Sequence, residues 1–127
     1  MSEEEAKKAI EPAVRAVVDC IAQRRYADMP AYAVLEQLSA ADLEEMIEGY
    51  LALNQLTHID AYGAVCHFKP RYEYRQMRCI PYKDGSGFHV DYDLTTDGEL
   101  NDLTLQMEFL WNEAGALEAR VLDAHVM

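Results

Sequence analysis

Carboxylates are concentrated in residues 89–102, which read HVDYDLTTDGELND. The stretch begins at His89, and its acids are Asp91, Asp93, Asp97, Glu99 and Asp102. Acids at this spacing resemble the oxygen ligands of a calcium-binding EF-hand loop, and a histidine beside carboxylates could hold a transition metal. The same stretch could instead form an acidic surface for a protein partner, or the two strands of a β-hairpin.

The pattern of apolar residues favours the hairpin. Apolar residues alternate with polar ones on both sides of Asp97-Gly98, a pair typical of tight turns between antiparallel strands. One face of this predicted hairpin carries Phe88, Val90, Tyr92, Leu94, Leu103, Leu105, Met107, Phe109 and Trp111. An EF-hand loop would need helices on both sides and a glycine at its sixth position, where this chain has Thr96. We therefore expect paired strands whose apolar face, Trp111 included, packs under helices.

Helical spacing of apolar residues marks the first half of the chain. It predicts a helix over residues 2–25, and Asp28 opens a second one in which Tyr32 faces inward. A third helix begins with a capping box at Ser39 and ends at Asn54 in a left-handed conformation.

The second half of the chain has the two-residue period of strands. Strands are predicted over residues 71–82, 87–96, 102–112 and 116–127. Residues 55–69 are the least regular part and are expected to be a loop, with one short strand around residues 64–68. Helices followed by strands predict a single α+β domain over residues 1–127, with the helices packed on a curved antiparallel sheet of about four to five strands.

Tight turns at the two Asp-Gly pairs set the predicted register of the sheet. They place Arg78 opposite Asp91, and Asp93 opposite Asp102. Two like charges directly opposite each other destabilise a sheet. We therefore expect a raised pKa for at least one carboxyl of the second pair, and a gain in stability on substitution of Asp93 by asparagine.

The overall charge of the chain indicates which classes of molecule it is expected to bind. Acids outnumber bases by 23 to 11, which gives a net charge of −12. Residues 69–83 hold five bases and one acid, whereas residues 84–118 hold nine acids and no base. Such a surface repels nucleic-acid phosphates and anionic membranes, so neither is an expected partner. A basic protein is the electrostatic complement.

Sequence motifs indicate neither a cofactor nor a secreted protein. The chain has no P-loop, no Gly-x-Gly-x-x-Gly and no Gly-x-Ser-x-Gly, so we expect no cofactor. Its three cysteines are Cys20, Cys66 and Cys79, an odd number without Cys-x-x-Cys spacing. The N-terminus has no apolar signal segment, so we expect a soluble, cytoplasmic protein.

Two readings of function follow from these residues. The first is a non-catalytic binding domain, of the size and charge of immunity proteins, that meets a basic protein through Asp91, Asp93 and Asp102. The second is a small-molecule pocket, for binding or for isomerase- or dehydratase-like acid–base chemistry, lined by polar groups that converge inside the fold: Tyr50, Tyr92 and His125.

Residues 90–105 (VDYDLTTDGELNDLTL) and the ending from Asp123 to Met127 resemble a bacterial family of small domains of unknown function. Its members share an aspartate-rich strand, Asp-Leu-Thr-Leu and a His-Val-aliphatic terminus, whereas residues 55–87 depart most from it. The order of elements also resembles the cystatin-like or nuclear-transport-factor-two-like cone. The resemblance implies a fold and no activity. Since cones with an exposed sheet commonly pair through it, we also expect a symmetric homodimer.

We predict no specific calcium or transition-metal binding at His89, Asp91 and Asp93. Side chains on one face of a strand diverge, whereas metal ligands must converge to within about 2.6 Å of the ion. Isothermal titration with each ion measures this directly. Stoichiometric binding tighter than about 10 μM that is lost in Asp91→Asn would overturn the prediction.

Overall fold

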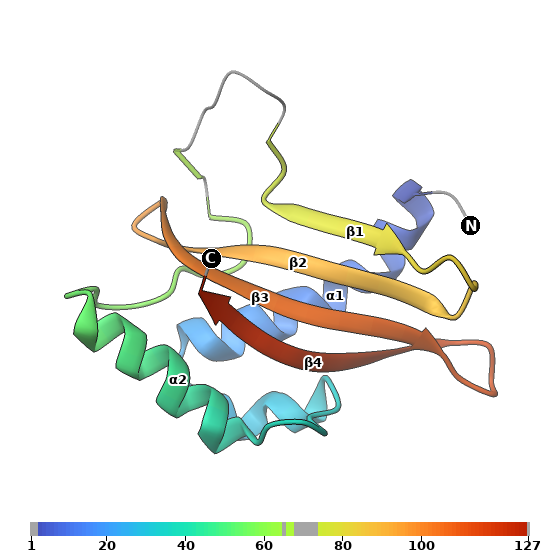
Figure 1. Ribbon diagram of the computed structural model, residues 1–127, viewed down its shortest axis with the longest axis horizontal. Coiled ribbons are helices and arrows are strands. Elements are labelled where there is room, and N and C mark those ends of the chain that lie inside the picture. Colours follow the sequence, from blue (N-terminus) through green and yellow to red (C-terminus); the bar gives the residue numbers. More distant parts are fainter. Residues whose placement is uncertain (1–2, 65, 68–73, 127) are drawn as a thin grey trace.

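The computed structural model describes residues 3–64, 66–67 and 74–126. Its order of elements confirms the predicted α+β class, with helical segments first and an antiparallel sheet second. The helical segments are α1 (Glu3–Ala22), the 3-10 helix η1 (Tyr26–Ala31) and α2 (Ala40–Leu53). The strands are β1 (Met77–Pro81), β2 (Gly87–Thr96), β3 (Glu99–Trp111) and β4 (Leu117–Val126). They lie in the order β1-β2-β3-β4, and Figure 1 shows α1 behind the curved sheet, with α2 beside its β4 edge.

One apolar core lies between the helices and the inner face of the sheet. Helix α1 contributes Ile10, Val14, Val17 and Ile21 at helical spacing, α2 contributes Leu43, Ile47 and Leu51, and the sheet contributes Leu94, Leu105, Met107 and Phe109. These side chains are at most 2% exposed, so the space between helices and sheet is filled. None of the described helices is both long and apolar enough to cross a membrane.

The capping box predicted at Ser39 is confirmed. The Ser39 hydroxyl accepts the Asp42 N–H at 3.0 Å, and the Asp42 carboxylate accepts the Ser39 N–H at 3.1 Å. The predicted left-handed end at Asn54 is wrong, because Asn54 has φ −99° and its amide closes the last turn on the Tyr50 carbonyl. The chain reverses one residue later, at Gln55, with φ 58°.

The segment after α1 differs from its prediction. Asp28 does not cap a helix, because its carboxylate accepts the Arg25 Nε–H at 2.8 Å, and the segment is a short 3-10 helix. Tyr32 is 45% exposed, so the prediction that it faces inward is wrong. Val34 then forms a parallel bridge to β4, with its N–H on the Ala119 carbonyl.

The register of the first hairpin is confirmed, and that of the second is wrong. Arg78 stands opposite Asp91 as predicted, but Asp93 stands opposite Thr104, not Asp102. The pairing slips by two residues where β3 bulges around Asp102, which has φ 67°. Because side chains alternate with period two, a slip of two changes the partners and keeps both faces of the sheet.

The end of the sheet away from the Asp97-Gly98 turn, where Gly87 pairs with Leu110, differs from the prediction at Trp111. Trp111 is 40% exposed although it was predicted to pack under the helices, because it is the last residue of β3 and adjoins the exposed turn 112–116.

Gly87 begins β2 at a point where the backbones of β2 and β3 approach closely. A Cβ at Gly87 would lie 1.8 Å from the Phe109 carbonyl oxygen, so this position has no room for a side chain.

Some predictions fall on residues that the structure does not describe. The proposed Ser2 cap and the start of the predicted strand 71–82 lie outside the described residues, as does part of the short strand at 64–68. The described residues of that last segment, 64, 66 and 67, belong to no strand.

We predict that Leu105→Ala lowers the free energy of unfolding by about 2–5 kcal/mol, because Leu105 is fully buried on the inner face. The matched control is Ile80→Ala on β1, whose side chain is 52% exposed and should cost less than about 1 kcal/mol. Urea titration of both variants measures the difference. Equal losses would contradict the assignment of the two faces.

Candidate functional site

The acids predicted to form a binding surface are separated by the fold. Asp91 and Asp93 lie on β2, on the outer face of the sheet that points away from the helices, whereas Asp102 lies in the bulge of β3. The side chains of Asp91 and Asp93 are 21% and 15% exposed, and Asp102 is exposed. The structure therefore does not bring the three carboxylates to one open surface.

Asp93 is the centre of a hydrogen-bonded network on the outer face. Arg78 of β1 binds it in bidentate fashion, with Nη1 at 2.9 Å from Oδ2 and Nη2 at 2.8 Å from Oδ1. The hydroxyls of Tyr74 and Thr104 also donate to its two oxygens. Burial alone would raise the pKa of Asp93, but the hydrogen bonds from Arg78, Tyr74 and Thr104 lower it below the usual value. The raised pKa expected from a facing Asp102 is therefore wrong.

Two further acids on this face also have partners. The His89 Nε2 lies 2.8 Å from Asp91 Oδ1, and the Tyr82 hydroxyl donates to Glu108 at 2.7 Å. Burial and that bond to Glu108 raise the pKa of Tyr82 to about 12. The outer face thus satisfies most of its own polar groups, which leaves few of them for a partner.

The β2–β3 turn at Asp97-Gly98 is held by a carboxylate from a distant loop. Asp97 and Gly98 both have positive φ, 53° and 80°, so their N–H groups point to one side as an anion-binding nest. The carboxylate of Asp60 fills it, accepting the Asp97 N–H at 3.0 Å and the Gly98 N–H at 2.8 Å, and the Thr95 hydroxyl at 2.8 Å. Burial would raise the pKa of Asp60, but these bonds outweigh it and lower the pKa.

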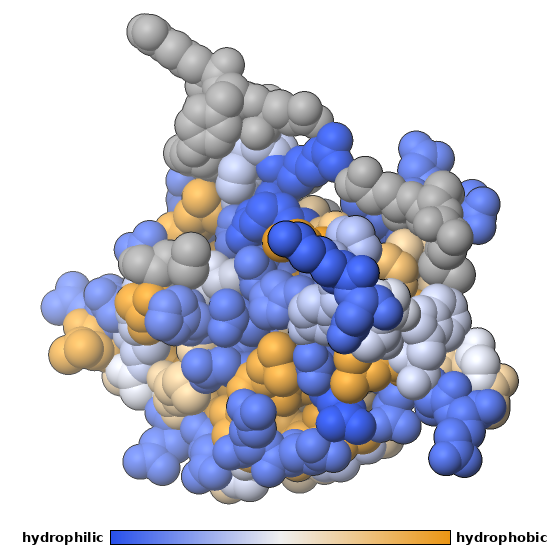
Figure 2. Space-filling view, turned by 45° about the vertical axis from the view of Figure 1, so that its right-hand side comes forward, coloured by the Kyte–Doolittle hydropathy of each residue, from blue (hydrophilic) through white to orange (hydrophobic). Residues whose placement is uncertain are grey.

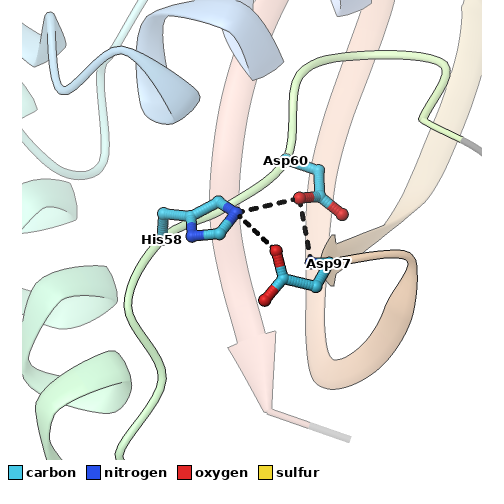
Figure 3. A group of neighbouring side chains, drawn as sticks. All are labelled: His58, Asp60 and Asp97. Atoms are coloured by element: carbon cyan, nitrogen blue, oxygen red, sulfur yellow. Dashed lines mark hydrogen bonds and ion pairs between the residues drawn. The ribbon is translucent and has the colours of Figure 1, made fainter.

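His58 completes this cluster, which Figure 3 shows. Its Nε2 lies 3.1 Å from Asp60 Oδ1 and 3.3 Å from Asp97 Oδ1, so the imidazole faces both acids. One ligand atom of each of the three residues lies within 4.8 Å of the others, a spacing that a metal ion could bridge. However, a carboxylate has about four lone-pair sites, and Asp60 already accepts three hydrogen bonds, from the Thr95 hydroxyl and the N–H groups of Asp97 and Gly98. The geometry therefore fits a locked turn better than a metal centre.

The acids at this end of the sheet are well exposed. We call Asp97, Glu99 and Asp102 the acidic tip. The side chains of Asp97 and Glu99 are 79% and 70% exposed, and their ion-pair partners are His58 and His67. Across the described part of the chain, no lysine or arginine pairs with any of the three acids. Two acids of the acidic tip, Asp97 and Glu99, are therefore open to solvent with only a histidine beside each.

Two apolar side chains are exposed near the acidic tip. Leu53, at the end of α2, is 83% exposed, and Val126, at the end of β4, is 50% exposed and pairs with the neighbour of Asp102 on β3. The Tyr50 hydroxyl of α2 donates to the Asn101 carbonyl, which brings that helix end to the bulge. Burial and the nearby charge of Asp102 raise the pKa of Tyr50.

The three predicted pocket residues do not converge. Tyr92 is buried, accepts the Gly63 N–H at 3.2 Å and stacks on Tyr62. Tyr50 binds the β3 bulge instead. His125 is exposed opposite Thr104, on the face of the sheet away from Tyr92.

Asp60 and His58 were not predicted as site residues, because they lie in the irregular segment 55–69 and contact the turn only through the tertiary fold. The one local signal is the Asp97-Gly98 pair itself, since a turn with two positive φ values creates a nest that some anion can fill.

We predict that Asp93→Asn destabilises the protein by about 1–3 kcal/mol at pH 7, because it leaves Arg78 half-buried without its carboxylate. The folded pKa of Asp93 is lowered, so its contribution to stability is full above the unfolded pKa of about 3.9 and disappears as pH falls through the folded value. Urea titrations of wild type and variant across this range should show the gap closing at low pH.

The matched control for this experiment is Asp102→Asn, an exposed acid whose left-handed backbone suits asparagine equally well. Its effect on stability should stay within about 0.5 kcal/mol. A stabilising effect of Asp93→Asn would contradict the network around Arg78.

A known protein family matches this chain. The family described as Domain of unknown function (DUF7668) matches residues 18–127. Searches of curated proteins and of solved structures find no significant match. The cone-like fold and the bacterial source therefore remain predictions, whereas the resemblance to a small domain of unknown function is supported. Since the match covers most of the chain, this protein belongs to the DUF7668 family.

Proposed function

We propose that the chain is a non-catalytic binding domain whose acidic tip, with Leu53 and Val126 beside it, meets a basic segment of a protein partner. The observation that carries the proposal is the fixed position of exposed carboxylates that no described lysine or arginine neutralises. Immunity proteins that mask basic toxins provide an analogy in size and charge.

The rigidity of the tip supports this proposal. Asp97 and Asp102 are non-glycine residues with positive φ, a conformation that costs free energy and persists only where surrounding contacts impose it. The Asp60 carboxylate and the bond from the His67 N–H to the Gly98 carbonyl supply such contacts. A turn that is already ordered loses little conformational entropy on binding, so its carboxylates are prepared for a partner.

Charge and apolar surface act at different stages of such an association. The net charge of −12 would attract a basic partner over distance and raise the association rate. Exposed Leu53 and Val126 would then supply apolar contacts that slow dissociation, because desolvated anchors contribute most of the binding free energy at an interface. Figure 2 shows a surface dominated by hydrophilic residues, with hydrophobic ones gathered in smaller areas.

The alternative, acid–base catalysis inside a cone, receives less support. An isomerase- or dehydratase-like site needs polar groups around a hollow interior. The residues between the described helices and the sheet are apolar and closely packed, and Tyr50, Tyr92 and His125 have separate surroundings. We therefore favour binding over catalysis.

The homodimer remains a prediction of its own. On the β4 edge, the Val34 backbone already bonds to Ala119 and Val121, and β1 on the other edge is short and ends at Pro81. Both features oppose strand-to-strand pairing. Any dimer would more easily use the outer face of the sheet, where Arg78 and Asp93 lie.

The test is an NMR titration with a synthetic amphipathic peptide of lysine and leucine. We expect the largest amide shifts in residues 97–102 and near Leu53. A triple variant, Asp97→Asn, Glu99→Gln and Asp102→Asn, should weaken binding at least about tenfold, or about 1.4 kcal/mol. Leu53→Ala should raise the dissociation rate.

The control changes charge by the same amount elsewhere. Glu4→Gln, Glu44→Gln and Glu45→Gln alter three exposed acids of the helices and should leave binding close to wild type. If both triple variants weaken binding equally, the attraction depends on net charge alone and the acidic tip is not a binding site.

A further inference from the structure

A cavity lies between α1 and the segment that follows it, apart from the acidic tip. Its volume is about 210 Å³, and it is lined by Ala16, Asp19, Cys20, Gln23, Arg25 and Tyr32. Three of these residues, Ala16, Asp19 and Cys20, belong to α1 at positions i, i+3 and i+4, so one face of the helix forms one wall, and Gln23 directly follows the helix.

The two charged residues of the cavity each keep unused binding capacity. Asp19 Oδ1 accepts the Tyr62 N–H at 2.9 Å, and no hydrogen bond or ion pair among the described residues uses its Oδ2. Arg25 donates from Nε to Asp28 and from Nη1 to Gln23, and within the same described residues its Nη2 has no hydrogen-bond partner. The cavity therefore presents an acceptor for a cation and a donor for an anion.

The floor and rim of the cavity are less polar. Cys20 is 3% exposed, and burial, which outweighs the nearby Arg25, raises the pKa of its thiol, so the thiol is neutral at pH 7. Ala16 adds a second small side chain beside it. Tyr32, which is 45% exposed, places an aromatic side chain at the opening. A ligand would meet charge at two walls and small uncharged groups between them.

We propose that this cavity binds a small zwitterion of the α-amino acid class. Its ammonium group would bind the Asp19 carboxylate, and its carboxylate would accept hydrogen bonds from Arg25 and the Gln23 amide. Because Asp28 already pairs with Arg25, the cavity has a net negative charge, so the ammonium–Asp19 contact is the stronger requirement. A side chain would extend past Tyr32 toward solvent.

The test is an NMR titration of the full chain with each of the protein amino acids in turn. We expect at least one to give saturable shifts at the amides of Asp19, Cys20, Gln23 and Tyr32, with Kd below about 1 mM. The methyl ester and the N-acetyl form of that amino acid should each bind at least about tenfold more weakly, since each removes one charge.

Amino-acid substitutions distinguish a loss of ligand binding from a loss of folding. Asp19→Asn keeps an oxygen for the Tyr62 N–H and should abolish binding, and Arg25→Gln should weaken it at least about tenfold, while both retain cooperative thermal unfolding. Lys8→Gln and Glu44→Gln, at exposed helix positions, should leave binding unchanged. No saturable shift with any amino acid up to about 10 mM, a range that covers the millimolar affinities expected of so small a ligand, would overturn the proposal. Equal binding of the ester would overturn it too, because the ligand would then be a simple amine. Either result leaves the role of the acidic tip unaffected.

Discussion

The carboxylate of Asp60 sits in the β2–β3 turn, where two backbone N–H groups and a threonine hydroxyl surround it. Residues 54–64 have no regular secondary structure of their own, so their position depends on such contacts. A second contact of this kind lies nearby, where the Thr96 hydroxyl donates a hydrogen bond to the His58 carbonyl. Through these bonds a loop that could otherwise sample many conformations is fixed to the sheet, and the sheet gains a turn that keeps its shape.

The outer face of the sheet depends on a different ionic interaction. A basic strand beside an acidic one allows Arg78 to neutralise Asp93, while Asp91 has a histidine partner and Glu108 a tyrosine partner. Such a face is polar without being strongly charged. Exposed acids lie at the acidic tip, and α2 carries others at Asp42, Glu44 and Glu45.

The sequence was sufficient to predict the elements whose signals are local. Alternating apolar residues located β2 and β3, and the Ser39 capping box located the start of α2. The bulge at Asp102 could not be predicted, because its strained backbone is held by contacts with α2 and β4 that no short stretch encodes. Tyr32 was misplaced for a related reason: the Asp28 carboxylate bonds to Arg25, and the segment is a 3-10 helix without a side-chain cap. Among the three predicted binding acids, Asp102 is the exposed one, whereas no local sequence pattern marks the positions of Asp60 and His58.

Gly87 has a consequence for how this family can diverge. A single added methyl group would collide with the backbone of Phe109, and a backbone carbonyl cannot move aside as a flexible side chain can. No other amino acid can therefore replace Gly87 unless β2 and β3 move apart at the same time. Selection should hold the position fixed while the exposed turn just before it varies freely, so that a constant glycine beside a variable loop would mark the β1–β2 hairpin across the family.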